Sequence, residues 1–163
     1  MGGLHPRLGY CLEAIIFIGI QASGKSTFYR ERFFNTHIRI NLDMLKTRHR
    51  EDLLLDACLR MKQPFVVDNT NPTIQARAKY IERAKAARFS VVGYFFQTSM
   101  KGAIERNSLR DERMRVPANA IGATSARLQI PTLQEGFDAL YRVQIDPLGG
   151  FHVEQWVDDV MEC

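Results

Sequence analysis

The chain has 163 residues, 45% of them hydrophobic and 25% charged, which is ordinary for one soluble globular domain. No run of about 18 apolar residues occurs, which argues against a membrane span, and Pro6 and Arg7 stand where a signal peptide would be apolar, so we expect a cytoplasmic protein. Three cysteines without C-x-x-C spacing and four scattered histidines argue against a disulfide framework and a zinc site. The net charge of +4 fits an anionic partner without identifying one.

The first regular element follows a glycine-rich start. We expect residues 1–12 to form a flexible lead-in and residues 13–163 to form a single domain. The apolar residues 14–18 predict a buried strand, and residues 28–34 predict a helix. Between them, residues 19–27 read Gly-Ile-Gln-Ala-Ser-Gly-Lys-Ser-Thr, which matches the phosphate-loop pattern G-x-x-x-x-G-K-[ST].

This loop has a mechanical reason for each fixed position. Gly19 and Gly24 let backbone N–H groups turn inward around phosphates at the start of the helix, Lys25 can reach the terminal phosphates, and the hydroxyl of Ser26 can ligate Mg²⁺. A glycine-rich turn without a ligand is the alternative, but the flanking strand and helix favour a site for ATP and Mg²⁺. We expect the nucleotide to contact Gly19, Ala22, Ser23, Gly24, Lys25, Ser26, Thr27, Arg106 and Arg110.

Four elements follow over about residues 37–88. Residues 37–41 alternate like a strand, and Asp43 stands where it can cap a helix over about residues 44–62. Residues 65–68 form a short apolar strand that ends in the carboxylate of Asp68. Asn71 can cap a further helix that begins at Pro72 and runs to about residue 88.

The second half continues the alternation of strands and helices. We predict a strand over residues 90–96, a helix over 100–113, a helix over 118–129 and a strand over 137–145. Arg106, Arg110 and Arg113 recur at i, i+4 and i+7, which places them on one face of the predicted helix. Solvated surface arginines are the alternative to a lid over the phosphates. Residues 151–163 predict an edge strand or a short terminal helix.

Alternation at these spacings predicts an α/β fold with a mostly parallel sheet and helices on both faces. Such a sheet holds its nucleotide at the carboxyl ends of the strands. We therefore expect a three-layer P-loop NTPase of the kinase type, with an arginine-bearing lid.

Four side chains outside the loop are candidates for chemistry. Asp43, at the end of the second strand, can accept the proton of an attacking hydroxyl, although a helix cap alone would also explain it. Asp68 can hold Mg²⁺ indirectly or orient its neighbours, although a loop carboxylate capping backbone N–H groups is about equally consistent with the sequence. Arg110, with Arg106 one turn earlier, can neutralise charge on the transferred phosphoryl group.

Several motifs resemble the kinase domain of polynucleotide 5′-hydroxyl kinases, including the polynucleotide kinase/phosphatases. They cover about residues 14–146 and occur in the same order as in that family. The phosphate loop is generic, whereas the Asp-Asn-Thr-Asn-Pro segment and the later Pro-Thr-Leu and Glu-Gly-Phe pieces are more specific. The segments that resemble this family are residues 19–28, 41–43, 68–72, 106–110 and 131–137.

The resemblance implies residue roles on this AAA-type, ATPase-like scaffold. It makes Lys25 and Ser26 the phosphate and Mg²⁺ ligands, Asp43 the general base for a 5′-hydroxyl, Asp68 an active-site carboxylate and Arg110 the lid arginine. The chain itself shows no phosphatase segment, so we expect only the kinase half of any end-healing activity.

This chain departs from the family pattern at four positions. Gln21 and Ala22 occupy positions where the family often has Pro and Gly, and the backbone cradle tolerates both. Leu42 stands where the family usually has arginine, which removes a positive charge beside Asp43. Lys46 replaces an arginine found in some members and cannot reproduce its bidentate phosphate contact.

Three functions therefore remain open from the sequence. The first is an ATP-dependent kinase acting on the 5′-hydroxyl of DNA or RNA. The second is a kinase for a small-molecule hydroxyl, which Leu42 and the small size favour. The third is a nucleotide-binding interaction module that transfers no phosphate.

Overall fold

The computed structural model describes residues 12–156, so the predicted lead-in lies outside the described residues apart from Leu12. The strands are β1 (Glu13–Ile18), β2 (Ile38–Ile40), β3 (Phe65–Val67), β4 (Ser90–Phe96), β5 (Ala139–Ile145) and β6 (Phe151–Gln155). The helices are α1 (Lys25–Arg32), α2 (Leu42–Leu45), α3 (Arg48–Met61), α4 (Ile74–Ala86), α5 (Met100–Ser108) and α6 (Ala118–Arg127), with 3₁₀ turns η1 (Glu112–Met114) and η2 (Leu133–Glu135).

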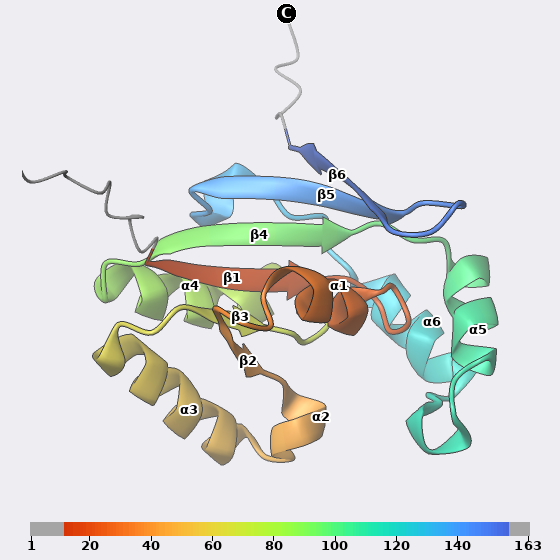
Figure 1. Cartoon of the computed structure of the whole chain (residues 1–163), viewed down its shortest axis with the longest axis horizontal. Coiled ribbons are helices and arrows are strands. Elements are labelled where there is room, and N and C mark those ends of the chain that lie inside the picture. Colours follow the sequence, from red (N-terminus) through yellow and green to blue (C-terminus); the bar gives the residue numbers. More distant parts are fainter. Residues whose placement is uncertain (1–11, 157–163) are drawn as a thin grey trace, which may run out of the picture.

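These strands form one sheet in the order β2-β3-β1-β4-β5-β6 (Figure 1). The first five strands are parallel, and β6 pairs antiparallel with β5. The prediction of a mostly parallel α/β sheet is confirmed. Residues 151–155 form an edge strand, one of the two forms predicted for the last segment, whereas residues 157–163 lie outside the described part.

Two hydrophobic cores cover the two faces of the sheet. Ala14, Ile16 and Ile18 of β1 face a core that includes residues of α3 and α4. Ile15 and Phe17 face the other way, into a core built on aromatic residues of α1. The period of two in β1 therefore produces the three layers, because alternate side chains point to opposite faces of a strand.

After β1 the chain adds β2 and β3 on one side of this strand and β4, β5 and β6 on the other, so the direction of strand addition switches at the carboxyl end of β1. β1 lies between β3 and β4, and α5 and α6 lie beyond the ends of β1 and β4 (Figure 1). Open parallel sheets bind their ligands outside such a switch point. Within the described part, no helix has the length and apolar character needed to cross a membrane.

The predicted helix over residues 44–62 is wrong, since the structure has two helices there. Asn41, not Asp43, caps α2, because its side chain accepts a hydrogen bond from the backbone N–H of Met44 (3.0 Å). Lys46 then has a positive φ (72°) that no helix continues, and Thr47 caps α3 by accepting from the N–H of Arg50 (3.2 Å). A local hydroxyl cap thus starts a new helix with only two residues between it and the first one.

The start of α4 also differs from the prediction. Thr73 caps this helix by accepting from the N–H of Ala76 (3.1 Å), so α4 begins at Ile74 and not at Pro72. Asn71, the predicted cap, instead has a left-handed backbone (φ 44°) and donates from Nδ2 to the carbonyl of Phe17 (2.8 Å). It ties the loop after β3 to the end of β1.

The predicted helix over residues 100–113 ends early, at Ser108. The side chain of Asn107 donates to the carbonyl of Val116 (2.6 Å) and accepts from its N–H (3.0 Å). This pair folds residues 109–116 back as a loop with η1. Arg106, Arg110 and Arg113 therefore do not share one helix face, contrary to the prediction from their spacing.

A buried ion pair explains part of the 131–137 motif. Arg77 of α4 has no exposed surface and donates from Nε and Nη2 to the two carboxylate oxygens of Glu135, at 2.7 and 3.0 Å. We expect Glu135→Leu to lower the free energy of unfolding by about 3–5 kcal/mol, because it leaves a buried guanidinium unpaired. Urea unfolding measures this. The double variant Arg77→Met/Glu135→Leu should recover most of the loss; a double variant as unstable as the single one contradicts the prediction.

Candidate active site

The phosphate loop is held at both ends by distant parts of the chain. The N–H of Gly19 donates to the carbonyl of Thr70 (3.0 Å), in the loop after β3. At the other end, Gly24 has φ 94°, and a Cβ on it would lie 2.9 Å from Cε1 of Phe151 in β6. Ala22 has φ 58°, which costs about 1 kcal/mol for a residue with a side chain. The loop therefore adopts a strained shape that its surroundings support.

Lys25 is the first residue of α1 and lies inside the loop. Its Nζ donates to the carbonyls of Gly19 (2.9 Å) and Ile20 (2.6 Å) and to Oγ of Ser23 (3.3 Å). Burial lowers the pKa of Lys25 from 10.5 to about 8, the charge of Asp68 raises it, and the charges of Arg110 and Asp43 have smaller, opposite effects. The ammonium group is therefore desolvated and held by groups that can exchange for a stronger anionic partner.

A second cluster joins the start of α1 to the ends of β2 and β3. Oγ of Ser26 donates to Oδ2 of Asp68 (3.1 Å), whose side chain is only 1% exposed. Arg39 of β2 contacts both groups: Nε lies 2.8 Å and Nη2 2.7 Å from Oδ2 of Asp68, and Nη2 lies 2.9 Å from Oγ of Ser26. The hydroxyl and the carboxylate thus lie together at a point that already attracts a cation.

Asp43 lies on α2, which follows the carboxyl end of β2. Its side chain is exposed, and among residues 12–156 its carboxylate makes no hydrogen bond or ion pair. It lies close enough to Lys25 for its charge to raise the pKa of that ammonium group. Asp43 is therefore a free carboxylate beside the phosphate loop.

Of the three arginines predicted to share a helix face, Arg106 and Arg110 approach the phosphate loop from α5 and the segment after it. Arg106 donates from Nε to the carbonyl of Ala22 (2.7 Å) and also contacts the hydroxyl of Thr98. The guanidinium of Arg110 makes no hydrogen bond or ion pair within residues 12–156, and its charge is felt by both Lys25 and Arg106. Burial lowers the pKa of Arg106, with Arg110 adding to the effect. Arg113 is exposed on η1.

The structure thus brings the predicted site residues to one edge of the sheet, and Thr27 lies there on the exposed side of α1. The sequence interpretation missed the pairing of Arg39 with Asp68. It also missed the side chain of Gln21, which donates from Nε2 to Oγ1 of Thr124 in α6 (3.0 Å). The one signal for Arg39 is a charge between two isoleucines, in the middle of a three-residue strand.

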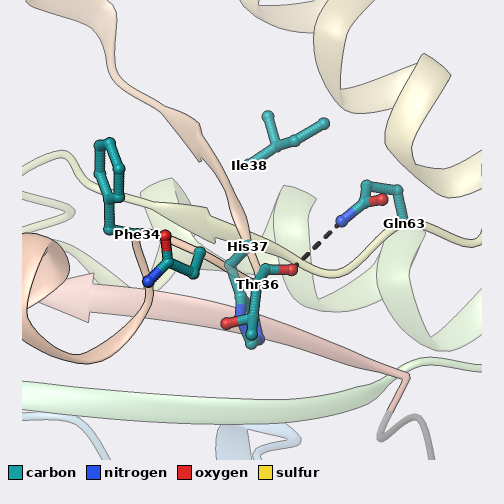
Figure 2. Close-up of a pocket in the computed structure, with 6 residues that line it drawn as sticks. Phe34, Thr36, His37, Ile38 and Gln63 are labelled. Atoms are coloured by element: carbon teal, nitrogen blue, oxygen red, sulfur yellow. Dashed lines mark hydrogen bonds between the residues drawn. The ribbon is translucent and has the colours of Figure 1, made fainter.

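A separate hollow lies at the opposite edge of the sheet, where β2 and β3 begin (Figure 2). There Gln63 donates from Nε2 to the carbonyl of Thr36 (3.3 Å). The residues that line this hollow are Phe34, Asn35, Thr36, His37, Ile38 and Gln63. Since the phosphate loop lies at the carboxyl ends of the strands, this hollow is not part of the candidate site.

Two relatives match most or half of the chain. A bifunctional polynucleotide phosphatase/kinase of Schizosaccharomyces pombe is 30% identical over 129 residues, which cover 77% of this chain and 32% of the relative. A putative bifunctional polynucleotide phosphatase/kinase of Acanthamoeba polyphaga mimivirus is 33% identical over 81 residues, which cover 49% of this chain and 19% of that protein. The resemblance described from the motifs is confirmed, and the chain spans a third or less of these relatives.

The fold has solved counterparts as well. The crystal structure of a gluconokinase from Sinorhizobium meliloti superposes with a TM-score of 0.59 at 19% identity, covering 85% of this chain and 86% of the gluconokinase. This likeness supports the three-layer P-loop fold and nothing finer. A family model described as an AAA domain matches residues 47–131. Since that match spans just over half of the residues, the chain belongs to the AAA domain family.

Proposed function

We propose that this protein is an ATP-dependent kinase that transfers the γ-phosphate to a hydroxyl, and that its acceptor is the 5′-hydroxyl of DNA or RNA. One observation carries the proposal: the phosphate loop, with Lys25 buried inside it and the Ser26–Asp68 pair at its end, lies near the carboxylate of Asp43 and the guanidinium of Arg110. A nucleotide-binding site without chemistry needs the loop alone. A free carboxylate and a free guanidinium on opposite sides of it suit phosphoryl transfer, and the two polynucleotide phosphatase/kinase relatives support the acceptor class.

The donor side of the proposed reaction uses the loop and the arginines. Backbone N–H groups at the start of α1 would surround the phosphates of ATP, and Lys25 would exchange its carbonyl partners for phosphate oxygens. Arg110 would neutralise charge that spreads over the transferred phosphoryl oxygens. Arg106, already bound to the carbonyl of Ala22, would hold the loop and the segment after β4 together.

Mg²⁺ fits the pair formed by Ser26 and Asp68. Their hydroxyl and carboxylate are hard oxygen groups that lie 3.1 Å apart. The metal would take the place of the guanidinium of Arg39, which pairs with both groups. We propose that Ser26 binds the metal and that Asp68 holds it directly or through water. The ion supplies charge neutralisation on the donor phosphates.

Asp43 is the proposed general base. As the acceptor oxygen bonds to the γ-phosphorus, the hydroxyl proton moves to the Asp43 carboxylate and the bond between that phosphorus and the β–γ bridging oxygen breaks, releasing ADP. Because Asp43 is exposed and unpaired within the described residues, it is available to a substrate that approaches from solvent.

A small-molecule hydroxyl is the second candidate acceptor. Leu42, which precedes Asp43, is half-buried and gives an apolar wall where the resembling kinases usually have arginine. Lys46, which follows α2, is a point charge that cannot make a bidentate phosphate contact. An acceptor with few phosphates suits these two residues.

The test is transfer of label from γ-labelled ATP to a matched set of acceptors. We expect labelled product with 5′-hydroxyl oligonucleotides of DNA or RNA, and none with the same oligonucleotides carrying a 5′-phosphate. Nucleosides and sugars in parallel reactions identify the second candidate if they are preferred. ATP binding without transfer to any of these acceptors would contradict the kinase proposal.

The lowered pKa of Lys25 gives a pH-dependent prediction. Phosphate oxygens favour the charged ammonium, so binding ATP should raise a pKa that is about 8 in the free protein. Above that pH, binding must take up a proton, and we therefore expect ATP affinity to fall as the pH rises through about 8. Calorimetry at pH 8.5 in two buffers of different ionisation enthalpy measures the uptake.

The same experiment at pH 6.5 is the control. There Lys25 is protonated in both the free and the bound protein, so this lysine adds no proton uptake. At pH 8.5 the phosphates of ATP are fully ionised, so an absence of proton uptake there would show that Lys25 is already charged before binding and that the prediction is wrong.

A further inference from the structure

The short helix that carries Asp43 is not held by hydrophobic burial. α2 has four residues, none of them buried, and its last residue, Leu45, only packs partly against the core. A one-turn helix is marginal by itself, since its few hydrogen bonds do not offset the ordering of the chain. The position of Asp43 therefore depends on polar contacts at the start of this helix.

Two asparagines make those contacts. Asn41 accepts from the N–H of Met44 (3.0 Å) and donates from Nδ2 to the carbonyl of Asp68 (2.6 Å). Asn69 accepts through Oδ1 from the N–H of Leu42 (2.9 Å). Both link the start of α2 to the end of β3, where Asp68 lies.

The orientation of the Asn69 amide depends on Glu51. Its Nδ2 donates to Oε2 of Glu51 (3.3 Å), while its Oδ1 faces the N–H of Leu42. A carboxylate can only accept and a backbone N–H can only donate, so a single orientation of the amide satisfies both neighbours. Glu51 thus selects the orientation in which Asn69 holds α2.

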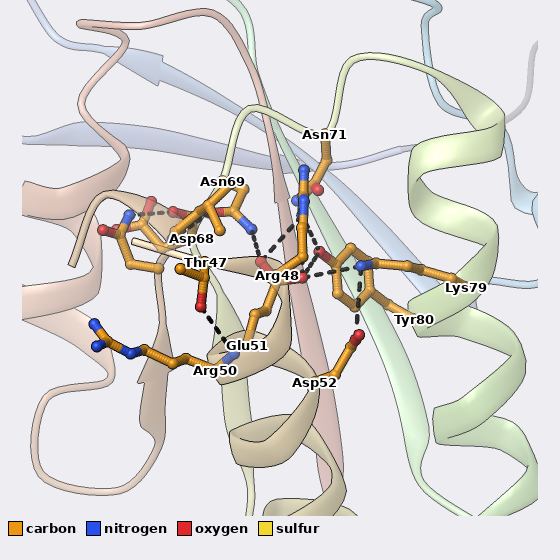
Figure 3. Close-up of polar contacts among 12 residues, drawn as sticks. Thr47, Arg48, Arg50, Glu51, Asp52, Asp68, Asn69, Asn71, Lys79 and Tyr80 are labelled. Atoms are coloured by element: carbon orange, nitrogen blue, oxygen red, sulfur yellow. Dashed lines mark hydrogen bonds and ion pairs between the residues drawn. The ribbon is translucent and has the colours of Figure 1, made fainter. Parts of the chain in front are cut away.

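Glu51 is itself fixed by an unusual number of donors (Figure 3). It has no exposed surface, and Oε1 accepts from the hydroxyl of Tyr80 (2.5 Å), from Nζ of Lys79 (3.0 Å) and from Nη1 of Arg48 (3.1 Å). Burial alone would raise the pKa of Glu51, but the hydrogen bonds from Tyr80 and Lys79 and the charges of Lys79 and Arg48 hold it below its usual value. The group is a charged acceptor locked between α3 and α4.

We propose that Glu51 is a positioning residue for Asp43, acting through Asn69 and the start of α2. This inference rests on the proposed kinase function. The chain of contacts runs from Glu51 to the amide of Asn69, then to the N–H of Leu42, the residue before Asp43. Glu51 touches no substrate in this scheme.

Glu51→Gln is the most direct test, because it keeps the shape of the side chain. Its amide oxygen replaces Oε1 and stays with Lys79 and Tyr80, which directs its NH₂ group toward Nδ2 of Asn69. Two donors then face each other, which favours turning the Asn69 amide over. The turned amide presents its NH₂ group to the N–H of Leu42 and can no longer accept from it. We expect kcat to fall about 10- to 100-fold, as for other displaced catalytic groups, with the KM for ATP unchanged.

A double-mutant cycle separates positioning from general stability. Asn69→Ala should lower kcat by a similar factor, and Glu51→Gln/Asn69→Ala should lower it no further, because both changes break the same chain of contacts. Leu55→Ala is the matched control: it lies one turn further along α3, is fully buried and should lose stability without lowering kcat well below its unfolding temperature. Independent, multiplying losses in the cycle would overturn the inference.

A readout without substrate keeps this inference distinct from the kinase proposal. Hydrogen exchange at the N–H of Leu42 should accelerate in Glu51→Gln but not in Leu55→Ala, whether or not the protein transfers phosphate. If the wild-type protein labels no acceptor, the kinase proposal fails alone. If the wild-type protein is active and Glu51→Gln alters neither kcat nor the Leu42 exchange rate, the positioning role of Glu51 is wrong.

Discussion

Replacing Asp43 by asparagine is expected to lower the rate of phosphate transfer by about 10²- to 10⁴-fold, the usual contribution of a general base. ATP affinity should stay close to that of the wild-type protein, because the donor contacts come from the loop and not from α2. The fold should also be unaffected, since the Asp43 side chain is exposed and makes no hydrogen bond within the described residues. Single-turnover transfer and equilibrium ATP binding on the same samples measure the two effects.

Asp56→Asn is the control for Asp43→Asn. Asp56 is a partly exposed carboxylate on α3 that pairs with Arg60 one turn later, so the substitution removes the same charge away from the site. An equal loss of activity in both variants would mean that net charge, and not a base at position 43, governs the rate. A parallel loss of ATP binding in Asp43→Asn would place Asp43 on the donor side instead.

Arg110→Ala is expected to have the largest effect on the transfer rate, about 10³- to 10⁵-fold if Arg110 neutralises the transferred group. Arg110→Lys should restore little, because an ammonium cannot reproduce a planar, bidentate contact. Arg110→Ala should also raise the pKa of Lys25, since it removes the positive charge that lowers this pKa. Transfer rates and the pH at which ATP affinity begins to fall should therefore change together.

Arg113→Ala provides a matched control for Arg110→Ala. The spacing in the sequence placed both arginines on one helix face, whereas the structure leaves Arg113 exposed on η1, after α5 has ended. We expect near-normal transfer from Arg113→Ala. A loss as large as that of Arg110→Ala would show that the segment closes over the nucleotide in a shape closer to the predicted continuous helix.

The sequence predicts the sheet well because its strands are apolar runs with clear ends. The predicted strand over residues 90–96 is confirmed as β4, and the buried strand over 14–18 as β1 with one more residue. The errors lie where one side chain or one contact decides. α5 ends because Asn107 pairs with Val116 nine residues later, and the α2–α3 break depends on Asn41, Lys46 and Thr47, none of which alters the hydrophobic pattern.

The candidate site was predictable where it depends on local pattern and hidden where it depends on strand order. A motif locates Lys25 and Ser26, and a strand end locates Asp68. Arg39 gave no such signal, because a lone charge in a strand usually points to solvent. It meets Asp68 only because β2 pairs with β3 in parallel, which puts the ends of the two strands side by side. The burial of Glu51 likewise follows from how α3 packs against α4.

The close approach of the Phe151 ring to Gly24, which leaves no room for a side chain there, links the phosphate loop to the order in which the chain can fold. The loop comes early in the chain, yet its shape depends on Thr70 and on a strand that is made more than 120 residues later. Such non-local pairings form slowly, since long loops must close before any contact stabilises them. During synthesis, the loop sequence therefore exists long before the nucleotide site does. Nucleotide binding would then report on completed folding of the sheet from β1 to β6, and a ligand that binds only this state stabilises it as a whole.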